Sequence, residues 1–232
     1  LAGATDTLHM SRATQAAYYA AQHRQNRECR SQSEPGAERD RFRACEEYYA
    51  RRALETTGDI SKRFYFAYLV AVDEGDYDRA AAACDSALAC APPASHDYAR
   101  AAFYRSETER FRGDEAARFE WLVRAAMADV QGAVRDYGAL GGVAEELLRR
   151  GDAARAMRCI RVAINDTQAY NSPIRSWRDM AILPQIEQAY SERNARLRAM
   201  YVALILLAFL FALSAIGGVL FVLRQNRRLN AV

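Results

Sequence analysis

The sequence predicts an all-α protein in which stacked helical hairpins form a solenoid and a single transmembrane helix follows near the C-terminus. A Gly-Asp pair recurs at a constant spacing of 38 residues, with its glycine at positions 75, 113 and 151. Apolar residues at helical spacing lie on both sides of each pair. A fixed period of this length is typical of solenoid proteins. Residues 199–223, in contrast, contain no charged side chain.

The composition fits a folded protein and argues against a nucleic-acid surface. Of the 232 residues, 51% are hydrophobic and 26% are charged, which are ordinary fractions for a globular chain. The net charge is only +3, Lys62 is the only lysine, and the arginines are spread among acidic residues. A nucleic-acid surface needs a concentrated basic patch, so we expect no direct nucleic-acid contact through these residues.

Residues 1–60 are expected to form a divergent N-terminal helical hairpin. Helix-forming sequence covers residues 13–27 and 40–55, and the polar stretch SQSEPGAE between them is expected to be an extended turn. The chain begins at Leu1 without an initiator methionine, so we expect that a signal peptide or further upstream sequence has been removed or omitted.

Residues 61–168 are expected to form three hairpin repeats. In each repeat, the glycine lets the first helix end in the left-handed backbone conformation. The aspartate that follows favours the N-terminus of the second helix. The first repeat reads RFYFAYLVAVDE before the turn glycine and DYDRAAAACDSALACA after it.

These hairpins resemble the tetratricopeptide repeat. The string GDYDRAAAACDSALACAPP matches the second half of that motif, with a turn glycine, small residues where the helices pack closest, and a proline that ends the helix. The matching positions in the first repeat are Gly75, Tyr77, Ala80, Ala87, Leu88 and Pro92. Those in the third repeat are Gly151, Ala156, Ile160, Ala163 and Ile164. The middle repeat keeps Gly113, Leu122 and Ala125 but has Arg118 where a small residue is expected.

The resemblance implies a binding groove on the inner surface of the solenoid, which is lined by the first helix of each repeat. Carrying the family's groove positions over to this sequence gives Lys62, Tyr65, Leu69, Asp73, Arg100, Phe103, Glu107, Arg110, Glu145, Leu148 and Arg149. Their aromatic and arginine side chains would suit an extended peptide or a glycan. An ordinary solvated face explains any single position equally well.

A connector and a membrane span are expected after the repeats. Residues 169–198 are predicted to be a capping and connector helix that is interrupted at Pro184 and runs unbroken from Gln185 into the span. Residues 199–223 would form a helix about 37 Å long, enough to cross a hydrocarbon core of about 30 Å. Residues 224–232 are expected to be a basic cytoplasmic stub.

The arginines that flank the span do not decide its orientation. Three lie within residues 193–198 and three within residues 224–228, so the positive-inside rule gives a tie. Small side chains recur within the span at Ala208, Ala212, Ser214 and Gly218. Such side chains let two helices approach closely, so a homodimer through this face is a prediction.

The sequence contains no recognised catalytic, phosphate-binding or metal-binding motif, so we expect a binding protein that is not an enzyme and holds no cofactor or metal. His9, His23 and His96 are isolated from one another and have no zinc-site spacing. Gly141 and Gly142 lie in a helical stretch, where close helix packing explains them better than a flexible loop.

The five cysteines lack the C-x-x-C spacing of metal and redox sites. We expect Cys29, Cys45, Cys84, Cys90 and Cys159 to be small hydrophobic residues buried on helices. The only disulfide considered joins Cys29 to Cys45 across the N-terminal hairpin. It is disfavoured because the two residues are not level about the turn.

From about Trp121 onward the resemblance becomes narrower. Here the sequence is similar to the membrane-anchored tetratricopeptide-repeat regulators of Bacteroidota-type bacteria, a family whose sensor region carries a domain-of-unknown-function label. The resemblance covers roughly residues 40–230 and is carried by WLVRAAMADVQGA, AEELLRRGDAARAMRCIRVAINDTQAYNSPIRSW, AILPQIEQAYSERNARLR and RQNRRLN. It implies that the repeats are periplasmic, that the span crosses the inner membrane, and that the C-terminus is cytoplasmic. The DNA-binding output that follows the span in such regulators is not part of this sequence.

Two functional hypotheses follow. In the first, the chain is a sensor and transducer whose repeats bind a protein, peptide or glycan ligand and whose helix signals across the membrane to a cytoplasmic, transcriptional output. In the second, it is a membrane-tethered scaffold or assembly factor that holds partner proteins and transmits nothing.

Overall fold

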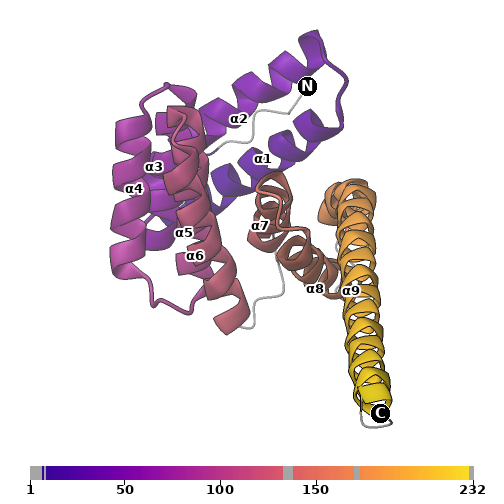
Figure 1. Cartoon of the computed structure of the whole chain (residues 1–232). Helices are drawn as coiled ribbons and strands as arrows, with labels where there is room; N and C mark the ends of the chain where they lie inside the picture. Colours follow the sequence, from indigo (N-terminus) through magenta and orange to yellow (C-terminus); the bar gives the residue numbers. More distant parts are fainter. Residues whose placement is uncertain (1–6, 8, 133–137, 170–172, 230–232) are drawn as a thin grey trace.

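The computed structural model describes residue 7 and residues 9–132, 138–169 and 173–229, without the side chains of 166–169, 173–179, 224, 225 and 227–229. These residues form nine helices and no strand, which confirms the all-α prediction (Figure 1). The helices are α1 (Arg12–Gln32), α2 (Ala37–Thr56), α3 (Ile60–Asp73), α4 (Tyr77–Cys90), α5 (His96–Arg112), α6 (Glu115–Gln131), α7 (Gly138–Arg149), α8 (Ala153–Ala169) and α9 (Pro173–Leu229).

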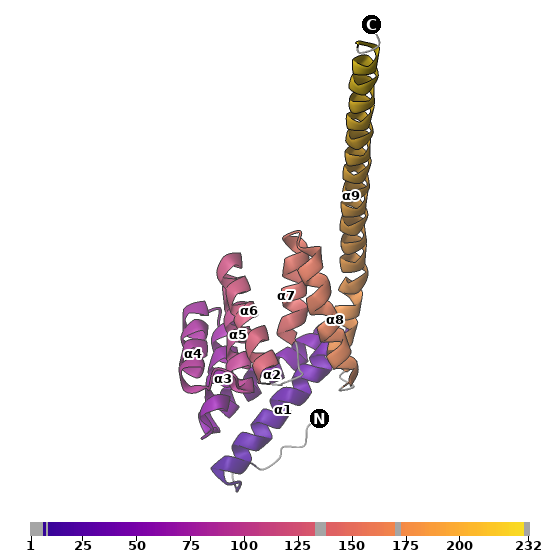
Figure 2. The ribbon, with the colours of Figure 1, turned by 60° about the horizontal axis from the view of Figure 1, so that its bottom comes forward.

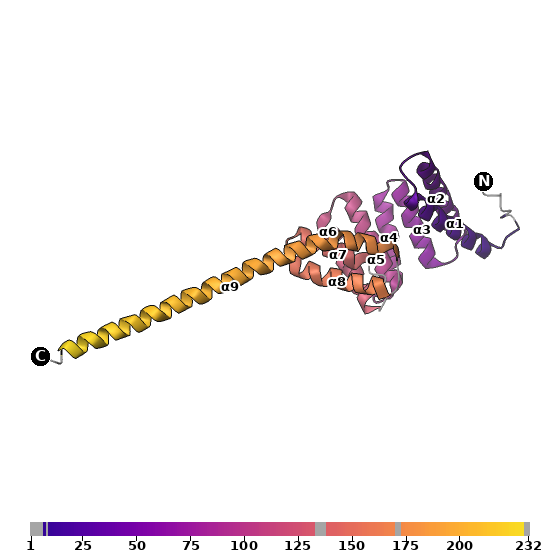
Figure 3. The ribbon, with the colours of Figure 1, turned by 90° about the vertical axis from the view of Figure 1, so that its right-hand side faces the viewer.

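The first eight helices pair as four antiparallel hairpins that stack in chain order. Each helix packs against its hairpin partner, and α2, α4 and α6 each also contact the first helix of the next hairpin. The start of α9 packs on α8 and α7, and the rest projects away from the repeats as a single rod (Figures 2 and 3). The chain therefore consists of a hairpin solenoid with a long helical extension.

The three Gly-Asp turns have the same hydrogen-bonded geometry. Gly75, Gly113 and Gly151 have φ angles of 73°, 79° and 79°, in the left-handed region that favours glycine. In each turn the N–H after the glycine donates to the carbonyl five residues back: from Asp76 to Ala71 at 2.9 Å, and equivalently in the other two repeats. This 6→1 bond defines a Schellman motif, so the predicted role of the repeated glycine is confirmed.

The aspartate of each Gly-Asp pair caps the following helix. Its carboxylate accepts a hydrogen bond from a backbone N–H in the first turn: Asp76 from Arg79 at 2.9 Å, Asp114 from Ala117 at 2.9 Å, and Asp152 from Arg155 at 3.0 Å. A side-chain cap of this kind stabilises a helix by about 1 kcal/mol. The pair that recurs every 38 residues therefore consists of a glycine that ends one helix and an aspartate that caps the next.

The N-terminal hairpin differs from its prediction in length. Its helices α1 and α2 extend well beyond residues 13–27 and 40–55, so the connection is only residues 33–36 and the expected long turn is wrong. The backbone of Gly36, with φ 153°, lies at the start of α2. An ion pair of 2.6 Å joins Arg30, near the end of α1, to Glu46 in the middle of α2.

The middle repeat accommodates Arg118 with its side chain largely buried: its Nε is shielded from solvent, and its Nη1 reaches Glu115. The Arg118 guanidinium pairs with Glu115 at 2.9 Å, and the side chain is only one-fifth exposed. The aliphatic part of Arg118 thus lies where, with a small residue, the neighbouring helix would pack. The Gly pair of the third repeat lies within α7, where a Cβ on Gly142 would come 3.2 Å from a Leu122 methyl group. Close packing therefore explains this glycine, as predicted.

The helix α9 continues through Pro184, so the predicted interruption is wrong. Proline removes one backbone hydrogen bond from a helix interior. Ile182, Leu183 and Ile186 pack on the repeat core on either side of Pro184 and hold both parts of the helix in place. The loss of one hydrogen bond is thereby offset by burial of apolar surface.

The second half of α9 is apolar and fully exposed. Its most apolar 18-residue window has a mean hydropathy of 2.7, and Phe211 exposes 77% of its surface. By length and composition it is long and apolar enough to cross a membrane. The small residues Ala208, Ala212, Ser214 and Gly218 lie in this exposed part, and dimerisation through them stays a prediction.

The cysteines are free thiols. Only Cys84 is fully buried, whereas Cys90 is exposed and Cys29, Cys45 and Cys159 are partly buried. The expectation of buried cysteines therefore holds for one position and is wrong for Cys90, the last residue of α4, which is exposed.

Candidate functional site

Three cavities border the first helices of the hairpins and share two residues, Arg100 and Tyr104. We call the largest of them the groove cavity; it has a volume of about 290 Å³. Its walls come from α1, α3 and α5: Ala20, His23, Arg24, Arg27, Lys62, Tyr65, Phe66, Arg100 and Tyr104. In a hairpin solenoid the first helices form the inner surface, and this cavity lies on it.

A second cavity, of about 160 Å³, adjoins the groove cavity across Arg27, Arg100 and Tyr104. It extends the same surface toward the third repeat. Its other lining residues are His96, Ala99, Phe103, Asp129, Gly138 and Ala139. The two cavities together form a continuous surface that runs from α1 to the N-terminal end of α7.

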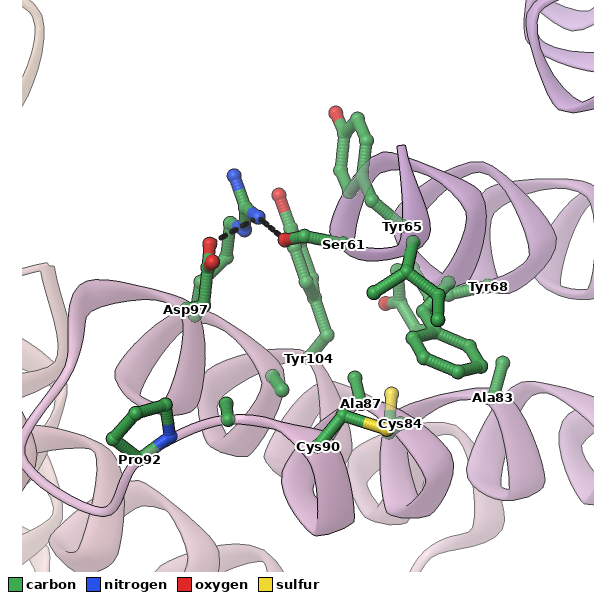
Figure 4. A pocket seen from close by; sticks show the side chains of 15 residues that line it. Ser61, Tyr65, Tyr68, Ala83, Cys84, Ala87, Cys90, Pro92, Asp97 and Tyr104 are labelled. Carbon is green, nitrogen blue, oxygen red and sulfur yellow. Dashed lines mark hydrogen bonds and ion pairs between the residues drawn. The ribbon is translucent and has the colours of Figure 1, made fainter. Parts of the chain in front are cut away.

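The third cavity, of about 100 Å³, lies beneath this surface between α3, α4 and α5. Its floor is apolar and includes Cys84, Cys90 and Pro92 (Figure 4). Tyr65 and Tyr104 separate it from the groove cavity. Figure 4 shows their hydroxyl groups pointing to the same side, away from Cys84 and Cys90.

The helix starts of α3 and α5 set the positions of these side chains. Asp59 caps α3 by accepting a hydrogen bond from the Lys62 N–H at 3.1 Å, and Ser95 caps α5 by accepting one from the Tyr98 N–H at 3.2 Å. Residues three and four apart on a helix share a face. Arg100, Phe103 and Tyr104 therefore point together from α5 toward the inner surface.

Aromatic rings form the wall of the groove cavity. The Tyr65 and Tyr104 ring centroids are 5.5 Å apart, and those of Tyr104 and Tyr68 are 4.6 Å apart. The His23 ring meets the rings of Tyr65 and Phe66 edge-on. Offset and edge-to-face contacts are the favourable geometries for such rings, so the wall is a packed surface.

Burial fixes the protonation of two groups in this wall. The His23 side chain is almost completely buried, and burial, opposed by the nearby Glu46 carboxylate, lowers its pKa to about 4. Burial followed by the neighbouring Tyr104 phenol raises the pKa of Tyr65. At neutral pH, His23 is therefore uncharged and the Tyr65 hydroxyl keeps its proton.

Arginine and lysine side chains surround this uncharged aromatic wall. The Arg27 guanidinium donates a hydrogen bond to the Tyr65 hydroxyl at 3.1 Å. The Arg100 guanidinium lies 5.7 Å from the centre of the Tyr65 ring and donates to Ser61 and Asp97, each at 2.7 Å. Arg24 and Lys62 complete the set. The carboxylate among the lining residues of the two inner-surface cavities is Asp129, which is buried.

The structure brings four of the eleven residues inferred from the tetratricopeptide resemblance to these cavities. Lys62 and Tyr65 line the groove cavity, Arg100 lines all three cavities, and Phe103 lines the second. They lie in the N-terminal halves of α3 and α5.

The other seven line none of the three cavities. Leu69 and Leu148 pack against the helix core. Glu107 and Arg110 pair with each other at 2.8 Å near the C-terminal end of α5. Arg149 joins α7 to α6 by pairing with Glu146 and Glu115. Asp73 lies at the end of α3, and Glu145 is exposed in the second half of α7.

Sequence reasoning missed the contribution of α1 and of Tyr104. His23, Arg24 and Arg27 follow one face of α1 at spacings of one to four residues, but that helix carries no Gly-Asp marker to align it with the repeats. A search for an Arg-aromatic face on every first helix, including the divergent one, would have found them.

Within the described part of the chain, no three or more His, Cys, Asp or Glu side chains are grouped so that they could hold a metal ion. The features of the cavities that could bind a ligand are their aromatic rings and cationic side chains.

Comparison with known proteins gives one match. The model of the family described as the SusR N-terminal TPR domain matches residues 3–180. No curated protein and no solved structure matches the chain. The matched segment contains α1 to α8, the start of α9 and every residue that lines the three cavities.

Proposed function

The chain belongs to the family of SusR N-terminal TPR domains, and we propose that it is a membrane-anchored sensor and transducer. Tetratricopeptide domains are interaction domains, and here the extracytoplasmic repeats bind a protein, peptide or glycan ligand on the inner surface of the solenoid. The helix α9 crosses the inner membrane and carries the signal to a cytoplasmic, transcriptional output.

The observation that carries this proposal is the continuity of α9. One helix of 57 residues begins on the repeats and ends beyond the exposed apolar segment. Ile186, with no exposed surface, belongs to the repeat core, and Arg193 lies 3.7 Å from the Asp152 carboxylate in the last Gly-Asp turn. A helix held in this way transmits movement of the last repeat to the apolar segment.

A contiguous packing path leads from the cavities to α9. Ala139 of α7 lines the second cavity and also belongs to the core cluster that contains Leu147, Ile160 and Ile186. Closely packed cores shift as units because they hold few voids. A ligand that moves the N-terminal end of α7 would therefore displace the packed start of α9.

The test breaks the helix between the repeats and the apolar segment. The double substitution Ala195→Gly with Arg196→Pro interrupts α9 beyond Arg193, at a cost of about 3 kcal/mol or more to local helix formation. We expect the response of a reporter fused after Val232 to fall to background when the fusion protein is expressed in bacterial membranes, because the two halves of α9 no longer move together.

The matched control is Ala195→Ser with Arg196→Gln, which removes the same charge and keeps the helix. It should retain the reporter response. If the helix-breaking variant signals like the control while both bind ligand equally, the chain does not transduce through α9, and a membrane-tethered scaffold becomes the better description.

A further inference from the structure

The inner-surface cavities combine an excess of positive charge with an uncharged ring wall. Arg24, Arg27, Lys62 and Arg100 line the groove cavity, and that cavity has no carboxylate in its lining. The whole chain carries a net charge of only +3. The cations are thus concentrated here relative to the rest of the molecule, and a cleft lined by one sign of charge attracts ligands of the opposite sign.

Two of these cations are not neutralised by a neighbouring acid. Within the part of the chain that the structure describes, neither Arg24 nor Arg27 has a carboxylate oxygen within 4.0 Å, although most other arginines of the repeats do. Arg27 instead donates to the neutral phenol of Tyr65. A guanidinium has five N–H donors, so Arg27 keeps donors for a ligand beyond those that face the phenols of Tyr65 and Tyr104.

Arg27 and Arg100 approach the same place from different helices. Both line the groove cavity and the second cavity, and both contact Tyr65, one through its hydroxyl and the other over its ring. Guanidinium groups bind carboxylates with two parallel hydrogen bonds, and they do so most strongly where water is partly excluded. Two such groups that line the same cavities are suited to a single anionic group.

The size of the cavities limits the ligand. The volumes of about 290 and 160 Å³ are each smaller than the roughly 300–1,000 Å³ of typical ligand pockets, so only a small molecule fits. The rings of Tyr65 and Tyr104 offer a flat apolar surface beside the cations, which fits the face of a ring-shaped skeleton.

We propose that the inner surface binds a small organic acid, whose anionic group lies between Arg27 and Arg100 and whose ring lies against Tyr65 and Tyr104. This inference rests on the proposed sensor function and goes beyond it, because it adds a small acid to the ligand classes named there. The shared chemistry is an acid group on a ring, and the source is either a sugar acid or an aromatic acid.

The experiment compares acids with neutral partners of the same shape. Binding of D-galacturonate and D-galactose, and of 4-hydroxybenzoate and 4-hydroxybenzamide, is measured by ligand-observed NMR on the full chain in lipid nanodiscs. We expect the acid of at least one pair to bind roughly tenfold or more tightly than its neutral partner, because a charge-assisted hydrogen bond is replaced by a neutral one. The pair that shows the difference identifies the source.

Variants assign the effect to the named arginines. Arg27→Gln and Arg100→Gln should each raise the Kd of that acid by roughly tenfold or more. Arg24→Gln, which changes an exposed side chain, should raise it by a smaller factor and serves as the second variant if another fails to fold. Arg43→Gln on α2 removes the same charge far from the cavities and should leave the Kd unchanged.

Equal affinity for acid and neutral partner, absence of binding by both acids, or an effect of Arg43→Gln as large as that of Arg27→Gln would each overturn the inference. The sensor function is judged separately. If a neutral ligand binds independently of the arginines and signalling still requires an intact α9, the acid inference is wrong and the proposed sensor function stands. If the acid binds as expected but no signal passes through α9, the sensor function is wrong and the acid site stands.

Discussion

Replacement of Ile186 by alanine is expected to lower the free energy of unfolding by about 2–5 kcal/mol, the usual cost of truncating a large core side chain. Ile186 has no exposed surface and lies in one cluster with Leu147 of α7 and Ile160 of α8. Among the described side chains of α9, it is a fully buried contact that attaches this helix to the repeats. The substitution should therefore weaken the domain and loosen the start of α9 together.

Urea denaturation followed by tryptophan fluorescence measures this effect, because Trp121 packs against the same cluster. The matched control is Met180→Ala, two turns earlier on the same helix, where 53% of the side chain is exposed. It should change the stability by less than about 0.5 kcal/mol. A loss below about 1 kcal/mol for Ile186→Ala would show that α9 does not share the repeat core.

Acidification is expected to remove about 3 kcal/mol of stability through His23 alone. Burial lowers the pKa of this imidazole from 6.5 to about 4, and each unit of difference between the folded and unfolded pKa corresponds to about 1.4 kcal/mol. Between these two values the unfolded chain binds the proton and the folded chain does not. His23 therefore costs no stability above pH 6.5, and the free energy of unfolding falls progressively as the pH decreases from 6.5 toward 4.

The measurement compares wild type with His23→Gln at pH 7 and pH 4. Asp73 acts in the opposite direction, because burial and then repulsion from Glu47 and Glu46 raise its pKa to about 6, so protonation of this carboxyl favours the folded state below that pH. This effect is common to both proteins and cancels in their difference. The wild type should lose about 3 kcal/mol more than the variant. Equal losses would mean that His23 is solvated and that the ring wall is open.

The repeats could be predicted because their signal is local. Gly75, Gly113 and Gly151 need a left-handed backbone, and the aspartate after each one caps the next helix. These requirements are met by single residues at fixed positions, so a sequence shows them directly. The long α1 and the short turn after it were missed because contacts of the end of α1 with α2, such as the ion pair between Arg30 and Glu46, are tertiary and not visible in the local sequence.

The candidate site could be predicted only in part, because it depends on how helices distant in sequence cross. The groove positions on α3 and α5 were inferred from the tetratricopeptide resemblance, and they include Tyr65 and Arg100, which line the cavities. Which end of each helix faces the cavities is decided by α1, whose Arg27 reaches the Tyr65 hydroxyl. The cavities consequently lie at the N-terminal halves of α3, α5 and α7, away from Arg110 and Arg149.

The Pro184 prediction was wrong for a similar reason. Proline disfavours a helix interior through a local hydrogen bond and a local clash, which the sequence shows. The burial of Ile182, Leu183 and Ile186 that holds the helix on both sides is a tertiary contact, which it does not show.

The central claim is that α9 joins the repeats to the apolar segment as one unbroken helix, and hydrogen–deuterium exchange of the full chain in nanodiscs tests it most directly. Backbone amides from Glu187 to Arg198 lie between the last core contact and the apolar segment. The account predicts slow exchange throughout this interval, and fast exchange only in the Ala195→Gly, Arg196→Pro variant, because continuous helical hydrogen bonds protect the amides. Exchange of these wild-type amides at the rate of an unstructured chain would contradict it, since a flexible linker cannot carry a signal from the repeats to the membrane.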